Sequence, residues 1–260
     1  MSTGDGLPLD GAASAVVGDL ANVFEAPATA GALDDEFEGD GLDSRWAAWD
    51  PNSLGPTDPT IERGALTMQA VQSGSQRIYA GIYDQDNDLN ASTPDDVTVY
   101  CGLSLSGSNA DDNSDYACIG VGILRDATPV AATDQVHVAV AYSGSEFQAE
   151  ACYCNQASSQ NGLGTRLMFQ LGGLVHCALH WNRSAGRVQA YVSLDGIGWR
   201  MVRTNIAPNV GYNMAWDPRR LAIFASSSML GTQQPVGRVH YLRVRNEPFD
   251  MSKPVPSGAG

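Results

Sequence analysis

Residues 97–105 read Val-Thr-Val-Tyr-Cys-Gly-Leu-Ser-Leu, with an apolar side chain at every second position. Successive side chains of a β-strand point to opposite faces of a sheet. The alternation therefore places Val97, Cys101 and Leu105 on one face and Thr98 and Ser104 on the other. This stretch is predicted to be a strand with one face toward a core.

The same period of two continues through the central segment of the chain, from about residue 34 to residue 245. It is clear in residues 136–142, 146–153, 174–181, 187–193, 221–225 and 238–245. Turn signals such as Ser143-Gly144-Ser145 and Asp195-Gly196 separate these stretches. Short alternating strands with frequent turn signals are typical of an antiparallel β-sandwich, and no stretch in this segment supports a long amphipathic helix.

The two ends of the chain differ from this central segment. Residues 1–33 are rich in small residues, Gly and Pro, and contain one short apolar helical face. The side chains of that face are Val16, Val17, Leu20 and Phe24. Such a helix is marginal alone, so we expect these side chains to contact a partner. The predicted organisation is an N-terminal anchoring arm (1–33), a sandwich domain (34–245) and a C-terminal tail (246–260).

Acidic residues outnumber basic residues by 29 to 15, which gives a formal charge of −14. A surface this negative repels phosphate groups, and the sequence has no basic stripe, so binding to nucleic acid or to anionic lipid is not expected. No apolar run of about 18 residues occurs, so no membrane span is expected. The first residues lack the basic and apolar regions of a secretory signal peptide.

The sequence contains five cysteines, an odd number, and no Cys-x-x-Cys pair. Disulfide frameworks of secreted proteins usually have an even number, so buried thiols made in a reducing cytosol are expected. The strand alternation directs Cys101 and Cys177 toward the core. It places Cys152 and Cys154 on the strand face that also carries Glu150.

Residues 35–46 read Asp-Glu-Phe-Glu-Gly-Asp-Gly-Leu-Asp-Ser-Arg-Trp. This segment resembles the opening D-x-F-x-G-x-x-L-D-x-x-W of concanavalin A-like (laminin G-like) jelly-roll domains. Later segments that are similar to strands of this family are 64–68, 188–199, 221–226 and 239–244. The resemblance implies an all-β fold, an antiparallel two-sheet β-sandwich of the jelly-roll type, preceded by an extended N-terminal arm.

Domains of this family occur in lectins, glycosidases, adhesion modules and virion proteins of bacterial viruses. Family glycosidases of the laminarinase type carry E-x-D-x-x-E on one strand, and this triplet is missing here. The nearest pair, Glu146 and Glu150, is separated by about 13 Å along a strand. Two catalytic carboxyl groups lie roughly 5–9.5 Å apart, so this pair does not form a catalytic dyad by itself. The sequence is therefore predicted not to be an enzyme.

These observations together predict a non-enzymatic structural protein of a bacteriophage virion, in a tail fibre or as capsid decoration. Its lectin-like domain would serve host attachment by contacting surface glycans, and its arm would bind other virion proteins. The chain would form a homo-oligomer and would be made in the host cytoplasm. Two alternatives stay open: a free carbohydrate-binding lectin module, and a glycoside hydrolase or lyase.

The loop of residues 205–220 is the predicted contact with a glycan or with a neighbouring subunit. It combines aromatic rings with planar hydrogen-bonding groups, as sugar sites do. The candidate residues are Tyr212, Asn213, Trp216, Asp217, Arg219 and Arg220. The alternative is that Trp216 caps one end of the sandwich while the arginines pair with carboxylates.

No cofactor is predicted, although one acidic loop offers candidate ligands for Ca²⁺ at Asp84, Asp86 and Asp88. Calcium prefers clustered oxygens, but leucine stands at position 89, where the EF-hand loop needs glycine. His176 and His180 share one strand face at a separation of about 13 Å, too far to bind one metal ion together. They are expected to face solvent.

Overall fold

The computed structural model describes residues 33–50, 59–69, 79–89, 95–106, 116–129, 134–143, 146–154, 165–168, 173–204, 206, 214, 216–227 and 236–258. These residues form β-strands, turns and irregular segments, and none of them is helical. A membrane-spanning helix is accordingly not found among the residues described.

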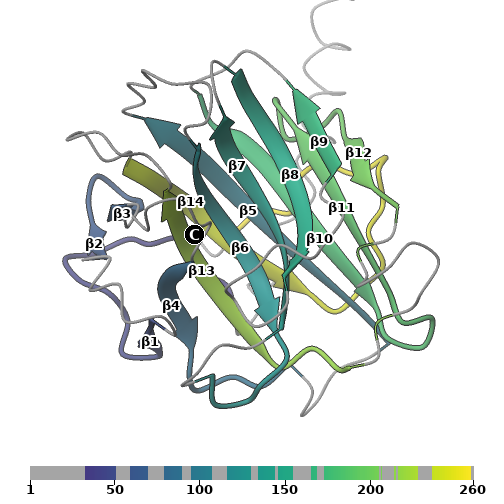
Figure 1. Cartoon of the computed structure of the whole chain (residues 1–260), viewed down its shortest axis with the longest axis horizontal. Helices are drawn as coiled ribbons and strands as arrows, with labels where there is room; N and C mark the ends of the chain where they lie inside the picture. Colours follow the sequence, from purple (N-terminus) through teal and green to yellow (C-terminus); the bar gives the residue numbers. More distant parts are fainter. Residues whose placement is uncertain are drawn as a thin grey trace, which may run out of the picture.

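Fourteen strands make up the described fold (Figure 1). In chain order they are β1 (Trp46–Trp49), β2 (Thr60–Ile61), β3 (Leu66–Gln69), β4 (Ala80–Asp84), β5 (Asp96–Ser106), β6 (Tyr116–Leu124), β7 (Gln135–Ser143), β8 (Glu146–Cys154), β9 (Thr165–Met168), β10 (Val175–Asn182), β11 (Arg187–Ser193), β12 (Arg200–Arg203), β13 (Arg220–Ser227) and β14 (Val236–Arg245).

The strands form two sheets of seven. The first sheet has the order β1-β4-β13-β6-β7-β8-β9, and the second has the order β12-β11-β10-β5-β14-β3-β2. All the neighbouring pairs are antiparallel. The two sheets lie face to face, with β6 and β7 across from β5, β7 also across from β10, and β8 across from β12 (Figure 1). The antiparallel β-sandwich expected from the sequence is confirmed.

The main core fills the space between the sheets, and the strand alternation sets which side chains enter it. Val97, Cys101 and Leu105 of β5 all lie in this core, as the period of two predicts. In β7 the core side chains are Val136, Val138 and Val140, and β8 contributes Ala149, Ala151 and Tyr153. Side chains at the intervening positions of these strands lie on the outer face of their sheet.

The outer faces are buried as well. All nine residues of β6 are buried, including Tyr116 and Cys118, which belong to a second apolar cluster on the outer face of the first sheet. A sheet buried on both faces needs an apolar or small residue at most positions, not only at every second one. The outer positions of β6 and β7 meet this need with Gly120, Gly122, Ala139 and Ala141.

The tail covers part of the outer face of the second sheet. The ring of Phe249 stacks on Tyr191 at a centroid distance of 4.0 Å and contacts Tyr100 and Trp199. Trp199 Nε1 donates to the carbonyl oxygen of Lys253 at 3.0 Å. The described part of the tail, residues 246–258, is therefore packed on the sandwich by aromatic contacts and hydrogen bonds.

Residues that follow the predicted arm attach to β14, the strand next to the tail. Asp35 and Leu242 exchange two backbone hydrogen bonds of 2.8 Å. Arg245 pairs with Asp34 at 2.7 Å, and Arg243 pairs with Glu36 at 2.6 Å. The predicted arm contacts Val16, Val17, Leu20 and Phe24 lie outside the described residues.

All five cysteines lie in the described part of the chain, and none of them forms a disulfide. Each is buried. Cys101 and Cys177 face the main core, whereas Cys118, Cys152 and Cys154 lie on the outer face of the first sheet. The expectation of buried thiols is confirmed, and so are the faces that the alternation assigned.

The stacking of Phe249 predicts that the tail contributes to stability. Phe249→Ala should lower the free energy of unfolding by about 1–3 kcal/mol, because it removes a half-buried ring from a four-ring cluster. Urea denaturation measures the change. Met251→Ala is the matched control, since that tail side chain is 45% exposed. Equal stability of the two variants would contradict a packed tail.

Candidate functional site

A small pocket opens at the end of the sandwich where β10 and β11 are joined by a tight turn. The turn is closed by a hydrogen bond from Gly186 N to Arg183 O at 3.0 Å, and Gly186 adopts a positive φ of 56°. Met214 N then donates to Gly186 O at 2.7 Å, which ties a residue of the 205–220 loop to this turn. Met214, Trp216 and Asp217 therefore line the pocket together with Arg183 and Gly186 of the β10–β11 turn.

The pocket has a volume of about 170 Å³. Its described lining consists of Trp181, Arg183, Gly186, Met214, Trp216 and Asp217. The rings of Trp181 and Trp216 are in contact, with centroids 4.9 Å apart and planes tilted by 58°. Trp181 is fully buried in the core, whereas Trp216 is half-buried. We call this feature the end pocket.

Charged and polar groups lie beside these rings. Arg183 Nε lies 3.8 Å from Asp217 Oδ1, and the Asp217 side chain is 55% exposed. Trp216 Nε1 is buried and has no hydrogen-bond partner in the described part of the chain. The end pocket therefore presents the half-buried ring of Trp216 together with a guanidinium and a carboxylate.

The predicted contact residues of the 205–220 loop do not all lie at the end pocket. Trp216 and Asp217 line the end pocket. Arg219 instead donates to both carboxylate oxygens of Asp88 at 2.5–2.9 Å, and Arg220 Nε donates to the carbonyl oxygen of Ala127 at 2.6 Å. The two arginines thus hold neighbouring loops in place. The remaining candidates, Tyr212 and Asn213, lie outside the described residues.

The acidic loop after β4 holds its carboxylates through hydrogen bonds and ion pairs. Asp84 Oδ1 accepts from the backbone N–H groups of Asp86 and Asn87 at 3.1 and 3.0 Å. Asp88 forms a bidentate ion pair with Arg219. A calcium ion would compete with these donors for the same oxygens, and calcium binding here stays an untested prediction.

The two histidines of β10 have protein partners. His180 Nε2 lies 2.8 Å from Asp96 Oδ1, and the residue is only 8% exposed. His176 Nδ1 lies 2.7 Å from the hydroxyl of Tyr241, and burial lowers its pKa. The expectation that both face solvent is wrong, because the outer face of the second sheet is itself largely covered.

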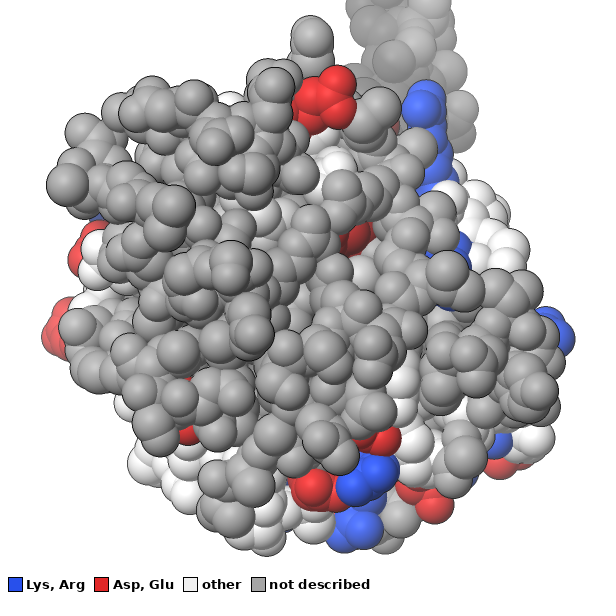
Figure 2. Space-filling view, viewed as in Figure 1, with Lys and Arg blue, Asp and Glu red and all other residues white. Residues whose placement is uncertain are grey.

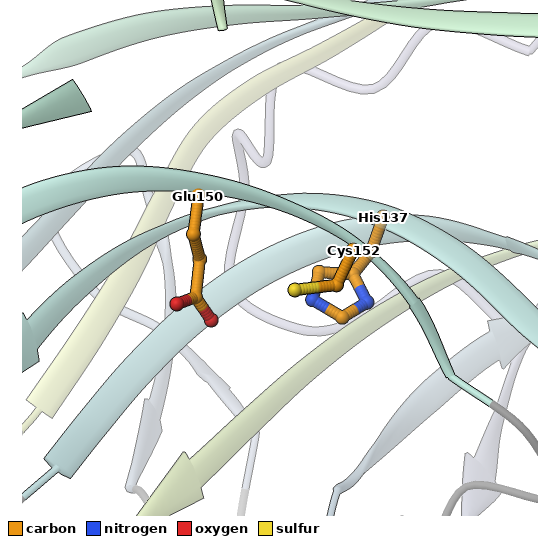
Figure 3. A group of neighbouring side chains, drawn as sticks. All are labelled: His137, Glu150 and Cys152. Carbon is orange, nitrogen blue, oxygen red and sulfur yellow. The ribbon is translucent and has the colours of Figure 1, made fainter. Parts of the chain in front are cut away.

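A cluster of potential metal-ligating side chains lies on the outer face of the first sheet (Figure 3). His137 of β7 and Cys152 of β8 are direct cross-strand partners, and Glu150 is two residues from Cys152 on the same face. One ligand atom from each of the three lies within 4.8 Å of the others, and all three residues are buried. We call these residues the His-Glu-Cys cluster.

Small residues and aromatic rings shape the surroundings of this cluster. Gly122 of β6 is the cross-strand partner of His137, and a Cβ added to this glycine would come 3.1 Å from the histidine Cβ. The imidazole packs against the rings of Tyr79 and Phe224 at centroid distances of 5.3 and 4.9 Å. Tyr116 of β6 donates its hydroxyl to Glu150. The small side chains of β7 between them, Ala139 and Ala141, leave room for this contact.

Burial sets the ionisation of the groups around the cluster. It lowers the pKa of His137 to about 3, so the imidazole is neutral near pH 7. Burial also raises the pKa of Tyr79 well above its usual value, with further contributions from nearby Cys154 and Cys118. The phenol is therefore protonated at neutral pH.

Sequence reasoning missed this cluster. It placed Glu150 and Cys152 on one face of a strand, but His137 lies on another strand, and only the register brings it opposite Cys152. Glu146, the other carboxylate of β8, is exposed at the start of the strand, whereas Glu150 is buried in the sheet. The two therefore have different environments, as well as a large separation along the strand.

The described surface charges are mixed. In Figure 2, arginine and carboxylate side chains lie beside one another at the margin of the molecule. The pairs Arg125–Asp134 and Arg219–Asp88 are examples. Over the described part of that view no extended basic patch is visible.

No protein-family model matches the sequence, and no curated protein matches it either. The fold is similar to that of solved enzymes. A non-specific endo-β-1,3(4)-glucanase of glycoside hydrolase family 16 gives a TM-score of 0.52 at 15% identity, covering 85% of this chain and 95% of that one. The Bacillus licheniformis β-glucanase gives 0.50 at 11% identity, with 84% and 99% coverage.

A xylan β-1,4-xylosidase from Bacillus halodurans gives a TM-score of 0.51 at 14% identity. The match covers 85% of this chain and 40% of the xylosidase, so this chain spans less than half the length of that enzyme. At these identities the similarity shows the fold alone. The two glucanases support the jelly-roll architecture that the motif of residues 35–46 implied.

These comparisons correct the functional expectation. The neighbours described above are glycoside hydrolases, so the prediction of a non-enzymatic bacteriophage virion protein, in a tail fibre or capsid decoration, is wrong. That prediction rested on a missing signal peptide and a missing carboxylate triplet. Neither absence excludes an active site, because the same fold can carry its carboxylates in an arrangement other than this triplet. The comparisons likewise give no support for a lectin or for host attachment.

Proposed function

We propose that this chain is a carbohydrate-active protein of the glycoside hydrolase kind and that it holds its glycan in the end pocket. The observation that carries the proposal is the composition of that pocket. The half-buried ring of Trp216, which packs on the buried Trp181, forms an aromatic wall, and Arg183 and Asp217 lie at its edge. Sugar sites combine an aromatic surface for the C–H face of the ring with planar groups that bind hydroxyls.

The volume of the end pocket limits what it can hold. Pockets for drug-sized ligands occupy about 300–1,000 Å³. The end pocket, at about 170 Å³, has room for one sugar unit. The glycan would therefore place a single residue, such as a chain end, against Trp216, with the rest of the chain outside the pocket.

Charge selects among the possible glycans. The chain carries a formal charge of −14, so acidic polysaccharides are repelled and neutral ones are not. The structural neighbours act on neutral β-linked polymers, namely β-glucans and xylan. We therefore place the substrate among neutral β-linked glucans and xylans.

For hydrolysis, Asp217 is the carboxylate of the described pocket lining. Asp88 is a second carboxylate nearby, because Asp88 and Asp217 both contribute to raising the pKa of Arg219. Glycoside hydrolysis uses two carboxyl groups, one as acid and one as base or nucleophile. We assign the exposed Asp217 to one of these roles and Asp88, which is held by Arg219, to the other.

Trp216→Ala tests the binding site. Loss of the ring should weaken binding of xylo- or gluco-oligosaccharides by about 1–3 kcal/mol, or roughly 5- to 150-fold in Kd, measured by isothermal titration calorimetry. Ile197→Ala is the control, because this exposed residue lies in the turn at the opposite end of β11. Unchanged affinity in a folded Trp216→Ala protein would remove the end pocket as the glycan site.

Asp217→Asn tests the chemistry separately from binding. The amide keeps the shape of the side chain but cannot exchange a proton, so the release of reducing ends should fall by about 10²-fold or more. Binding of the oligosaccharide should change far less. Glu247→Gln, at an exposed carboxylate of the tail, is the control. Full turnover in Asp217→Asn would exclude this residue from the reaction.

A further inference from the structure

We propose that the His-Glu-Cys cluster is a zinc site, with His137, Glu150 and Cys152 as its protein ligands. The cluster lies on the outer face of the first sheet, away from the end pocket, and the glycan proposal does not depend on it. Imidazole, carboxylate and thiolate are the three ligand types that zinc takes from proteins. They reach one point from two adjacent strands (Figure 3).

The spacing fits a metal ion of this size. Zinc binds nitrogen and oxygen at about 2.0–2.2 Å and sulfur at about 2.3 Å, which places tetrahedral ligand atoms about 3.5 Å apart. The three ligand atoms already lie within 4.8 Å of one another. Side-chain movements of about 1 Å would bring the three ligand atoms to bonding distance of one ion and leave the fourth position to a water molecule. The backbone is fixed by the β7–β8 ladder, in which His137 pairs with Cys152.

The histidine supplies an independent observation that a ligand belongs here. Its Nδ1 lies 3.8 Å from Cys154 Sγ, whereas its buried Nε2 has no hydrogen-bond partner in the described part of the chain. Buried polar atoms are nearly always satisfied, and an orphaned one indicates a missing water or ion. A metal ion accepts the lone pair of a neutral imidazole nitrogen, while the other nitrogen keeps its contact with Cys154.

Charge and support around the cluster agree with a divalent ion. One Zn²⁺ with a carboxylate, a thiolate and a neutral imidazole has no net charge, which suits a buried position. Tyr116 donates its hydroxyl to Glu150 and so orients the carboxylate. Rings of Tyr79 and Phe224 fix the plane of the imidazole. Outer contacts of this kind orient metal ligands in known sites.

The test uses the full chain, stripped with a chelator and titrated with zinc chloride alone. Elemental analysis after dialysis should give one zinc per chain. Loading with Co²⁺ should produce a thiolate-to-cobalt charge-transfer band, which reports a cysteine ligand directly. A chain that retains no stoichiometric zinc, or that binds cobalt without this band, would overturn the proposal.

Variants assign the ligands. Cys152→Ser should abolish the cobalt band, and His137→Gln and Glu150→Gln should each weaken zinc affinity at least tenfold. Cys118→Ser is the matched control, since Cys118 is a buried thiol on the same outer face and outside the cluster. If serine is not tolerated, Cys152→Ala replaces it, because the cross-strand neighbours already include alanines. A cobalt band of full strength without Cys152 would contradict the assignment.

Discussion

Burial of the outer face of the first sheet, and of part of the outer face of the second, is the constraint on which the rest of this structure depends. A sandwich that buried only its inner faces could use any polar residue at every second position. Here β6 is buried along its whole length, and the tail covers part of the outer face of the second sheet. The residues at the outer positions must therefore be small or aromatic, or must be polar residues that bind another group of the protein. Such polar side chains are removed from water, which changes their chemistry.

The two sites follow from this constraint in different ways. On the outer face of the first sheet, glycine and alanine in β6 and β7 leave space that the rings of Phe224 and His137 occupy. Polar groups held there are desolvated, which keeps the imidazole neutral. At the end of the sandwich Trp181, which is still buried in the core, contacts the half-buried Trp216, and the end pocket lies beside these rings.

The sequence predicted the parts of the fold that depend on local pattern. The alternation in residues 97–105 assigned the core face of β5 correctly, and the same rule placed Cys152 and Glu150 together on the outer face. The register of the β7–β8 pair follows from the turn signal at residues 143–145, because a turn sets the register of its hairpin. The sequence analysis did not extend that pairing as far as His137 and Cys152. The contact between Trp181 and Trp216 joins a strand to a distant loop, and the stacking of Phe249 was hidden in a segment whose prolines suggested only a tail. The functional expectation failed because absent motifs do not describe a site.

The central claim is that the end pocket binds a neutral β-linked glycan. A crystal structure of the chain with a xylo- or gluco-oligosaccharide tests it most directly. The account predicts one sugar ring packed against Trp216, with hydroxyls in hydrogen-bond contact with Arg183 and Asp217. An oligosaccharide bound on either sheet face, with the end pocket unoccupied, would contradict it.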